Sequence, residues 1–321
     1  MTAKKKNKTS KLSVENLLTM AQLTPRDIEL ILATAEQLKA AFRRGRSDRS
    51  LQGQILAGIF EKSSTRTRVS FEAAMYQLGG AMFYLAGRDL QLGRGETIAD
   101  TARVLSRYVN GIMIRTDAHE KVVEMAKHAA VPVINALTDY SHPCQILSDL
   151  LTLRERFGRL KHLRLAYIGD GNNVARSLIY GAAKTGMDLT LASPMGFEID
   201  RHTVELSEAD RKRSGGTLRL TQDPVQAATQ VDAVYTDVWV SMGQEKEQAQ
   251  RLKALRKYQV NEKLMAHTAP GAVFLHCLPA HRGQEVTEEV IEGRQSIVFD
   301  QAENRLHVQK AILKLLMERK G

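Results

Sequence analysis

Residues 54–85, QILAGIFEKSSTRTRVSFEAAMYQLGGAMFYL, carry the pattern that decides the fold. Residues 54–60 and 81–85 are short apolar runs of the length that buried strands have. Residues 63–78, which lie between them, have the length and spacing of a helix. Two strands joined by a helix pair in parallel through a right-handed crossover. The stretch therefore predicts a strand–helix–strand unit of an α/β domain.

The same alternation extends in both directions from this unit. Upstream, apolar residues at helical spacing from Val14 to Phe42 predict two helices, with Thr24 and Pro25 placed as an N-cap and first helical position. Downstream, the first half is expected to continue with a helix at 97–108, a strand at 111–114, a helix at 121–128 and a strand at 132–135. The second half is expected to contain a strand at 164–169, a helix at 173–184, and strands at 188–192, 233–235, 273–275 and 297–299.

A helix from about Pro143 to Phe157, ended by Gly158, is expected to bridge the two halves. A chain of 321 residues also suits two domains better than one core. We therefore predict an α/β protein with two doubly wound parallel-sheet domains, residues 1–147 and 148–321, joined by bridging helices. A last helix at about 305–318 is apolar on one side, which suits packing back on the body of the protein.

Composition argues against several classes of function. The net charge is +10, but five lysines lie in the first eleven residues, and without them it would be +5. Aromatic residues make up 5% and no nucleic-acid module is recognisable, so no nucleic-acid partner is expected. No window approaches the ~18 apolar residues of a membrane span, and no signal-peptide core is present. Cys144 and Cys277, the only cysteines, predict neither a disulfide framework nor a metal site, which fits a reducing cytoplasm.

The motif FEKSSTRTR at 60–68 opens the helix after the first strand. Backbone N–H groups of a first helical turn, hydroxyl donors and a fixed cation can converge there on an anion. The side chains concerned are those of Ser64, Thr65, Arg66 and Thr67. A lone motif of this kind would more often be a capped helix with surface arginines.

Arg68 is expected to have a different role from Arg66. The two arginines are two positions apart, which is about 200° around a helix, so both cannot easily serve one ligand. Arg68 is therefore expected to pair with a nearby carboxylate, either Glu61 or Glu72.

Polar residues also follow other predicted strands, and ligands of doubly wound sheets gather at the carboxyl ends of strands. Arg115 ends the strand at 111–114. The motif HPCQ at 142–145 places His142 and Gln145 on one face of a first helical turn. The motif DVWVSMG at 237–243 follows one strand of the second half, and HCLP at 276–279 follows the next.

Residues 169–173, GDGNN, imitate a dinucleotide-binding fingerprint after a strand. Val174 stands where the third glycine belongs, and the next strand ends in Ala192-Ser193 with no acid to bind a ribose. No nicotinamide cofactor is therefore expected. Trp239, the only tryptophan, is expected to pack rather than react.

Together FEKSSTRTR, HPCQ, DVWVSMG and HCLP resemble the ornithine carbamoyltransferase family, within the aspartate/ornithine carbamoyltransferase superfamily, over about residues 18–316. The resemblance implies a carbamoyl phosphate-binding domain at 1–147 and an ornithine-binding domain at 148–321, with the C-terminal helix returning to the first domain. It assigns to carbamoyl phosphate Ser64, Thr65, Arg66, Thr67, Gln91, Arg115, His142, Pro143, Cys144, Gln145, Cys277, Leu278 and Arg305. It assigns to ornithine Asn173, Asp237, Ser241 and Met242.

The activity that the resemblance implies is transfer of the carbamoyl group to the δ-amine of L-ornithine, giving L-citrulline and phosphate without a cofactor or metal. Cys277, Arg115 and His142 are the expected catalytic residues, and Gln91 is expected to be lent to the neighbouring subunit of a homotrimer. Whether Cys277 accepts a proton or only orients the amine stays open. The alternatives are a carbamoyltransferase for putrescine, N-acetylornithine or aspartate, and a catalytically silent regulatory protein on the same fold.

Overall fold

The computed structural model describes residues 11–90, 95–240 and 245–318. By its internal contacts the chain divides into two compact units, here called unit 1 (residues 1–138 and 306–321) and unit 2 (residues 139–305). Among the described residues no helix combines the length and apolar character needed to cross a membrane.

Unit 1 is built on a parallel sheet with the strand order β2-β1-β3-β4, four strands within the described residues. Its strands are β1 (Ile55–Phe60), β2 (Ala81–Ala86), β3 (Gly111–Arg115) and β4 (Val133–Leu137). Its helices before residue 139 are α1 (Pro25–Arg43), α2 (Thr65–Gln77), the short 3-10 helix η1 (Gly87–Asp89), α3 (Ile98–Leu105) and α4 (His119–His128).

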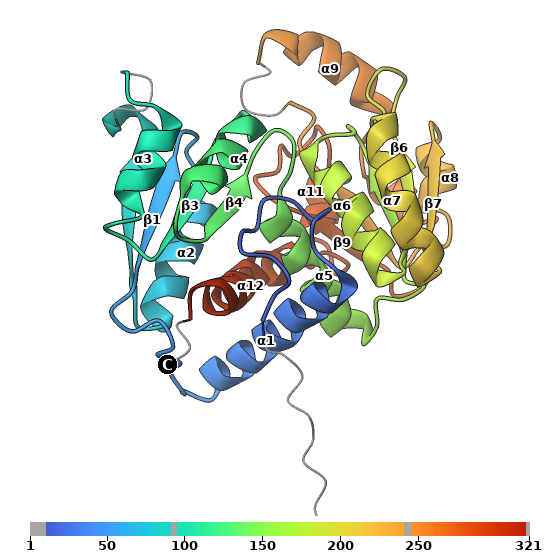
Figure 1. Cartoon of the computed structure of the whole chain (residues 1–321). Coiled ribbons are helices and arrows are strands. Elements are labelled where there is room, and N and C mark those ends of the chain that lie inside the picture. The colour runs from blue at the N-terminus through green and yellow to red at the C-terminus, as the bar shows by residue number, and fades with distance from the viewer. Residues whose placement is uncertain (1–10, 91–94, 241–244, 319–321) are drawn as a thin grey trace, which may run out of the picture. The chain divides into compact units, whose positions relative to one another are not determined.

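The winding of this sheet reverses next to β1. The chain moves from β1 to β2 in one direction and from β2 to β3 and β4 in the other. Right-handed crossovers therefore place α2 on one face and α3 and α4 on the other (Figure 1). The reversal makes the carboxyl ends of β1 and β3 the place where a doubly wound sheet binds ligands.

The prediction of two helices before β1 was wrong in part. Thr24 and Pro25 do begin α1, with a capping box in which Thr24 accepts from the backbone of Asp27. The preceding residues instead run along the sheet edge, because Leu17 donates to the carbonyl of Val133 and accepts from the amide of Asn135. Local periodicity does not reveal such a pairing, which spans more than a hundred residues.

Unit 2 has a second parallel sheet with the strand order β7-β6-β5-β8-β9, five strands within the described residues. Its strands are β5 (Arg164–Ile168), β6 (Asp188–Ala192), β7 (Thr217–Thr221), β8 (Ala233–Thr236) and β9 (Val273–His276). Its helices are α5 (Pro143–Phe157), α6 (Asn173–Thr185), α7 (Arg201–Ser214), α8 (Pro224–Ala228), η2 (Glu245–Glu247), α9 (Gln248–Leu255), η3 (Arg256–Tyr258), α10 (Glu262–Met265), α11 (Glu288–Ile291) and the first part of α12 (Val298–Met317).

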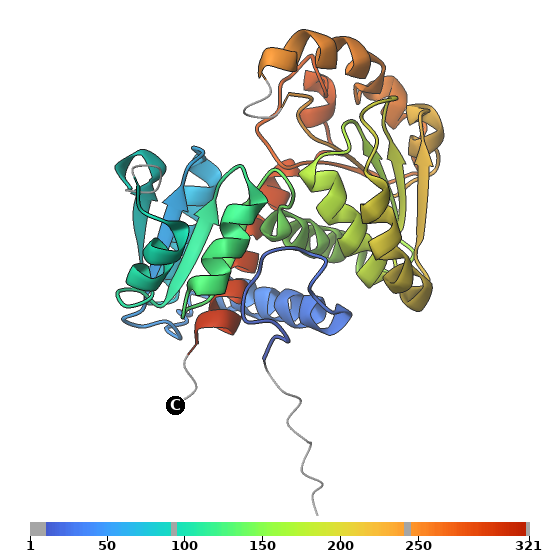
Figure 2. The same ribbon diagram turned by 45° about the horizontal axis from the view of Figure 1, so that its top comes forward.

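This sheet also reverses its winding, here between β5 and β8. The chain goes from β5 outward to β6 and β7, and α6 and α7 cover one face of that half (Figure 2). It then returns to β8 and β9 on the other side of β5. The carboxyl ends of β5 and β8 are therefore the expected ligand position of unit 2.

The core of unit 2 confirms the role predicted for Trp239. This side chain is 3% exposed and belongs to the apolar cluster that also contains Val234 and Phe274. The two parallel α/β sheets confirm the predicted fold class. The edge strand β7 was missed, and the strand expected at 297–299 was wrong because α12 begins at Val298.

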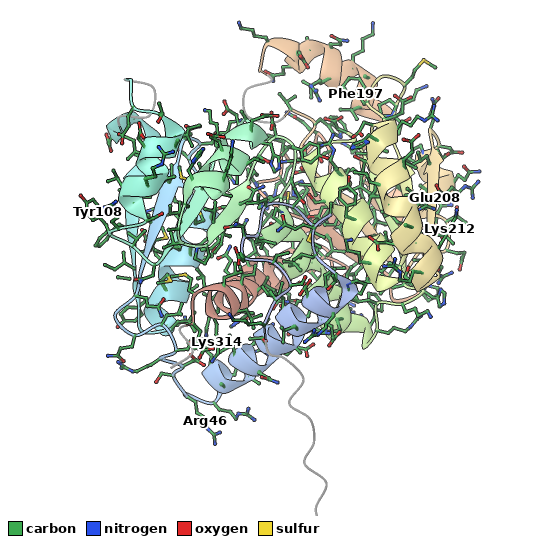
Figure 3. All side chains as sticks on the ribbon, viewed as in Figure 1. Arg46, Tyr108, Phe197, Glu208, Lys212 and Lys314 are labelled. Carbon is green, nitrogen blue, oxygen red and sulfur yellow. The ribbon has the colours of Figure 1, made fainter. Side chains whose placement is uncertain are left out.

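The chain passes from unit 2 to unit 1 within α12. In unit 1 the end of this helix is held by two lysines. Lys310 donates to the amide oxygen of Gln77 at 2.9 Å, and Lys314, labelled in Figure 3, donates to Asp48 at 2.7 Å. A Cβ added at Gly111 would lie 2.9 Å from the sulfur of Met317, so the end of this helix packs against β3 at that glycine.

Candidate active site

The anion cradle, defined as Ser64, Thr65, Arg66 and Thr67, lies at the start of α2 after the carboxyl end of β1. Ser64 is the N-cap, and its hydroxyl accepts from the backbone N–H of Thr67 at 3.2 Å and donates to the Thr67 hydroxyl at 3.0 Å. The first turn of α2 contains no acidic residue, so no carboxylate at this end of the helix opposes a bound anion. The predicted cradle is therefore the capped first turn of a helix that follows a buried strand.

Arg115 ends β3, which lies beside β1, and is paired in register with Phe60. The register between β3 and β4 shifts between Ile114 and Arg115, and such bulges change where a side chain points. Arg115 is 6% exposed. A buried guanidinium and the anion cradle thus follow neighbouring strands at the point where the sheet reverses.

A polar cluster holds this end of the sheet together. The carboxylate of Glu61 accepts from the Thr116 hydroxyl and, at 2.7 Å, from the ammonium of Lys121. Lys121 also donates to Asp117, whose pKa lies far below its ordinary value because the carboxylate accepts from the backbone N–H of Ala118 and from Lys121. The cluster ties the residues after β1 to those after β3.

Arg68 interacts with residues outside the anion cradle. It forms an ion pair with Glu72 at 3.0 Å, and its guanidinium lies 4.0 Å from the centre of the Tyr84 ring. Glu72 was one of the two partners predicted for Arg68, whereas Glu61 belongs to the Lys121 cluster. The pairing predicted for Arg68 with Glu72 is thus confirmed.

In unit 2 the HPCQ motif forms the start of α5. His142 is the N-cap, and its backbone N–H donates to the hydroxyl of Ser177 at 2.9 Å. Pro143 occupies the first turn, where a missing N–H costs nothing. Cys144 is fully buried, and burial raises the pKa of its thiol to about 12, so this thiol stays neutral. We therefore assign Cys144 to packing.

Gln145 sits in a buried hydrogen-bonded group with three other side chains. Its amide Nε2 donates to Oδ1 of Asp149 at 2.8 Å, and its Oε1 accepts from Nη1 of Arg305 at 3.2 Å. Gln301 also donates to Oδ1 of Asp149, at 2.7 Å. All four residues are at most 4% exposed.

At the carboxyl end of β8, Asp237 joins two further predicted regions. The thiol of Cys277, which follows β9, lies 2.9 Å from its Oδ1. The amide of Asn172 donates to its Oδ2 at 2.7 Å. Asn172 in turn caps α6 through its side-chain oxygen, which accepts from the amides of Val174 and Ala175. The site thus gathers at the reversal between β5 and β8.

The loop that presents Cys277 is held by His276. Its Nδ1 accepts from the backbone N–H of Leu278 at 2.8 Å, and its Nε2 lies 3.3 Å from Oε1 of Glu285. Leu278 has φ +57°, a left-handed conformation that is uncommon for a branched side chain. The hydrogen bond from Leu278 to the imidazole supports that conformation.

Asp237, His276 and Cys277 also place one potential metal-ligand atom each within 4.8 Å of one another. Both ring nitrogens of His276 already face partners, namely Leu278 and Glu285. A metal ion using this imidazole would have to displace one of those contacts.

The fingerprint-like turn at 169–173 has a packing explanation. A side chain at Gly171 would collide with the backbone of Glu198 and Ile199, so its glycine accommodates the protein's own chain. Arg251 closes the turn by donating to Asp170 at 2.7 Å while lying 5.2 Å from the ring centre of Phe197, which is labelled in Figure 3.

Three predicted residues, Gln91, Ser241 and Met242, lie outside the described residues. Asn173 is the first residue of α6, and its carbonyl accepts from Ser177. Sequence reasoning missed Asn172 and Asp149. Asn172 could have been found as the N-cap of a helix that follows a strand, whereas no local signal marks Asp149.

Two family models match most of the chain. Residues 15–155 match "Aspartate/ornithine carbamoyltransferase, carbamoyl-P binding domain", and residues 161–316 match "Aspartate/ornithine carbamoyltransferase, Asp/Orn binding domain". The ornithine carbamoyltransferase of Carboxydothermus hydrogenoformans is 55% identical over 302 residues, which cover 94% of this chain and 97% of the relative. That of Bacillus subtilis is 55% identical over 303 residues, covering 94% of each chain. The solved ornithine carbamoyltransferase from Pyrococcus furiosus has a TM-score of 0.93 at 52% identity, covering 95% of this chain and 98% of that one.

Proposed function

Because the chain belongs to the aspartate/ornithine carbamoyltransferase family, we propose that it transfers the carbamoyl group of carbamoyl phosphate to the δ-amine of L-ornithine. The products are L-citrulline and phosphate. The observation that carries this proposal is the contact between Asp237 and Cys277 at the carboxyl ends of β8 and β9, in the part of the chain that matches an Asp/Orn binding domain. Asp237 offers a carboxylate, which suits the charged α-ammonium of ornithine, and Cys277 offers a thiol, which suits the δ-amine that must react in its neutral form.

For carbamoyl phosphate, the proposal assigns the phosphate to the anion cradle and to Arg115. Hydroxyl groups, helix N–H groups and guanidinium groups are the donors that phosphate prefers. The other residues proposed for this substrate are His142, Pro143, Cys144, Gln145, Gln91, Cys277, Leu278 and Arg305. Within this set Cys144 contributes through its backbone, since its side chain is buried and neutral.

For ornithine, the proposal assigns the α-ammonium to Asp237 and the δ-amine to Cys277, with Asn173, Ser241 and Met242 completing the site. A carboxylate held by the amide of Asn172 is already oriented before the ammonium arrives. The δ-amine attacks only when it is neutral, and an alkyl ammonium has a pKa of ~10.4 in water. The site must therefore bind or generate the neutral amine.

In the reaction, the amine attacks the carbonyl carbon, a tetrahedral oxyanion forms, and phosphate leaves. Arg115 and His142 are proposed to stabilise the developing negative charge. Removing one such donor typically raises the activation free energy by ~2.7–4 kcal/mol. No cofactor takes part in this sequence.

A homotrimer in which Gln91 serves the neighbouring chain is also part of the proposal. Large apolar side chains are exposed on the edge strand β2 and the adjoining helix α2, including Phe83 at 54% and Tyr76 at 82%. Exposed apolar surface on a sheet edge is a common site of association.

Both cysteines are free thiols, which supports a reducing, cytoplasmic location.

Two matched pairs of variants test the assignment of the substrates. Arg66→Ala should weaken carbamoyl phosphate binding to the free protein, whereas Arg103→Ala, which removes an exposed arginine paired with Asp100 in the same unit, should not. Asp237→Asn should raise the KM for ornithine and leave carbamoyl phosphate affinity nearly unchanged. Asp232→Asn, one residue before β8 and paired with Arg164, is its control. Equal loss of both affinities in Asp237→Asn would overturn the assignment.

A further inference from the structure

A buried carboxylate lies directly behind Gln145 in unit 2. Asp149 is one turn further along α5 and is 0% exposed. Its Oδ1 accepts from two side-chain amides, Gln145 on its own helix and Gln301 on α12. The hydroxyl of Tyr235 lies 3.2 Å from the Gln301 amide nitrogen and completes the group.

This arrangement dictates which end of the Gln145 amide points away from Asp149. An ionised carboxylate can only accept hydrogen bonds, so it selects the NH2 end of each glutamine. The Nε2 of Gln145 is therefore turned inward. Its Oε1 is turned away from Asp149, where it accepts from Arg305.

The second amide extends the same control to β9. Gln301 gives its Nε2 to Asp149, and its Oε1 accepts from the backbone N–H of His276 at 2.9 Å. His276 directly precedes Cys277. One carboxylate thus orients two amides, one in the HPCQ motif and one that holds the strand before Cys277.

We propose that Asp149 is a positioning residue for carbamoyl transfer, which holds the Gln145 carbonyl oxygen outward to accept an N–H of the carbamoyl group. The inference rests on the proposed role of Gln145 in binding carbamoyl phosphate. Through Gln301, the same carboxylate fixes the end of β9 that presents Cys277.

The proposal carries a dependence on pH. Burial raises the pKa of the Asp149 carboxyl to about 7, although hydrogen bonds from Gln301 and Gln145 lower it. The other groups around Asp149 are Tyr235 and Cys144, whose pKa values are raised by burial, and Arg305, whose positive charge favours the ionised carboxylate. The imidazole of His276 lies beyond Gln301, engaged with Leu278 and Glu285.

Protonation converts Asp149 from a pure acceptor into a group that can also donate. A donor at this position can face the Oε1 of Gln145 and so permits the amide to turn over. Carbamoyl phosphate should then bind less well at pH values below the pKa of Asp149, because Gln145 would present an NH2 group to the NH2 of the carbamoyl group.

Asp149→Asn tests the proposal, because asparagine keeps the shape but carries both a donor and an acceptor. The KM for carbamoyl phosphate and kcat are measured from pH 5.5 to 9 at saturating ornithine. We expect the KM at pH 8.5 to rise roughly 5- to 150-fold, the range for one unsatisfied buried polar group. The rise in KM that we expect for the parent protein as pH falls through about 7 should be absent from the variant.

Ser148→Ala is the matched control. It removes a buried hydroxyl of the same helix, which donates to the carbonyl of Cys144, and it should leave the KM for carbamoyl phosphate unchanged. Gln301→Met, which removes one of the two amide donors, should raise the KM a few-fold and serves if Asp149→Asn does not fold.

Gln145→Ala separates the proposed binding role of Gln145 from the positioning role of Asp149. In a double-mutant cycle, adding Asp149→Asn to Gln145→Ala should raise the KM by no more than the few-fold expected for Gln301→Met, because the rest of the effect of the carboxylate acts through the Gln145 amide. If Gln145→Ala keeps the parent KM, the proposed role of Gln145 fails. If Gln145→Ala loses affinity while folded Asp149→Asn keeps the parent KM and its pH dependence, the positioning role of Asp149 is overturned.

Discussion

Replacing Asp149 by asparagine should stabilise the protein more at pH 8 than at pH 5. Burial raises the pKa of this carboxyl from 3.8 to about 7 in the folded protein. In the unfolded chain the carboxyl ionises near its ordinary value, so between these two pKa values the folded state binds more protons. Stability from this group is therefore present at low pH and is lost as pH rises from about 4 to about 7.

The magnitude follows from the difference between the two pKa values. Each unit corresponds to about 1.4 kcal/mol, so the ionised form lowers the free energy of unfolding by about 4 kcal/mol above pH 7. At pH 5 the same linkage gives a loss of about 2 kcal/mol. The stability gained by Asp149→Asn should thus be about 2 kcal/mol larger at pH 8 than at pH 5. A fixed cost of the asparagine amide cancels in this difference.

The measurement is a set of urea unfolding curves for both proteins at several pH values, with Ser148→Ala as a control for changing a buried polar group of α5. Groups that titrate identically in both proteins cancel when the curves are compared at the same pH. A stability difference that stays constant from pH 5 to 8 would refute the conclusion that Asp149 is held ionised at a cost. A variant that is more stable but binds carbamoyl phosphate less well would illustrate a site selected for function over stability.

Two further predictions concern the reacting groups and the assembly. Cys277→Ser should keep most of the carbamoyl phosphate affinity, because the backbone of residue 277 is proposed to contact the carbamoyl group. It should lower kcat about tenfold or more, because a serine hydroxyl can donate to Asp237 but supplies no thiolate at neutral pH; full activity, measured as citrulline formed, would reduce Cys277 to a packing residue. Arg66→Ala and Gln91→Ala chains, each weak alone, should regain up to about one third of parental activity in verified mixed trimers, since every mixed ring holds one site with an intact cradle and an intact Gln91. Mixed trimers no more active than the parents would show that Gln91 does not act across subunits.

Local sequence patterns predicted those parts of the fold in which strand and helix alternate over short distances. The cap pair Thr24-Pro25, the helix from Pro143 to Phe157 and its left-handed end at Gly158 were all confirmed. Each depends on interactions within a few residues. Apolar periodicity failed before Thr24, where pairing with the distant strand β4 decides the conformation, and at 297–299, where α12 begins at Val298.

The difference between interactions of near and of distant residues also explains which residues of the site could be predicted. Residues that follow strands, such as Arg115 and Asp237, were found because a parallel sheet brings its carboxyl ends to one edge. The carboxylate behind Gln145 was not found, because its partner Gln301 is 152 positions away in the chain. In the sequence, Asp149 reads as one more polar residue on a helix.

The acceptor amine is the most direct test of the central claim. Phosphate release from carbamoyl phosphate is measured with L-ornithine, putrescine, N-acetylornithine and L-aspartate as separate acceptors, and the carbamoylated product is identified. We predict citrulline from ornithine, with kcat/KM roughly 10⁴-fold or more above that for putrescine, which lacks the α-amino acid group that Asp237 would bind. Equal or faster reaction with another acceptor, or no release with any of the four, would contradict the account.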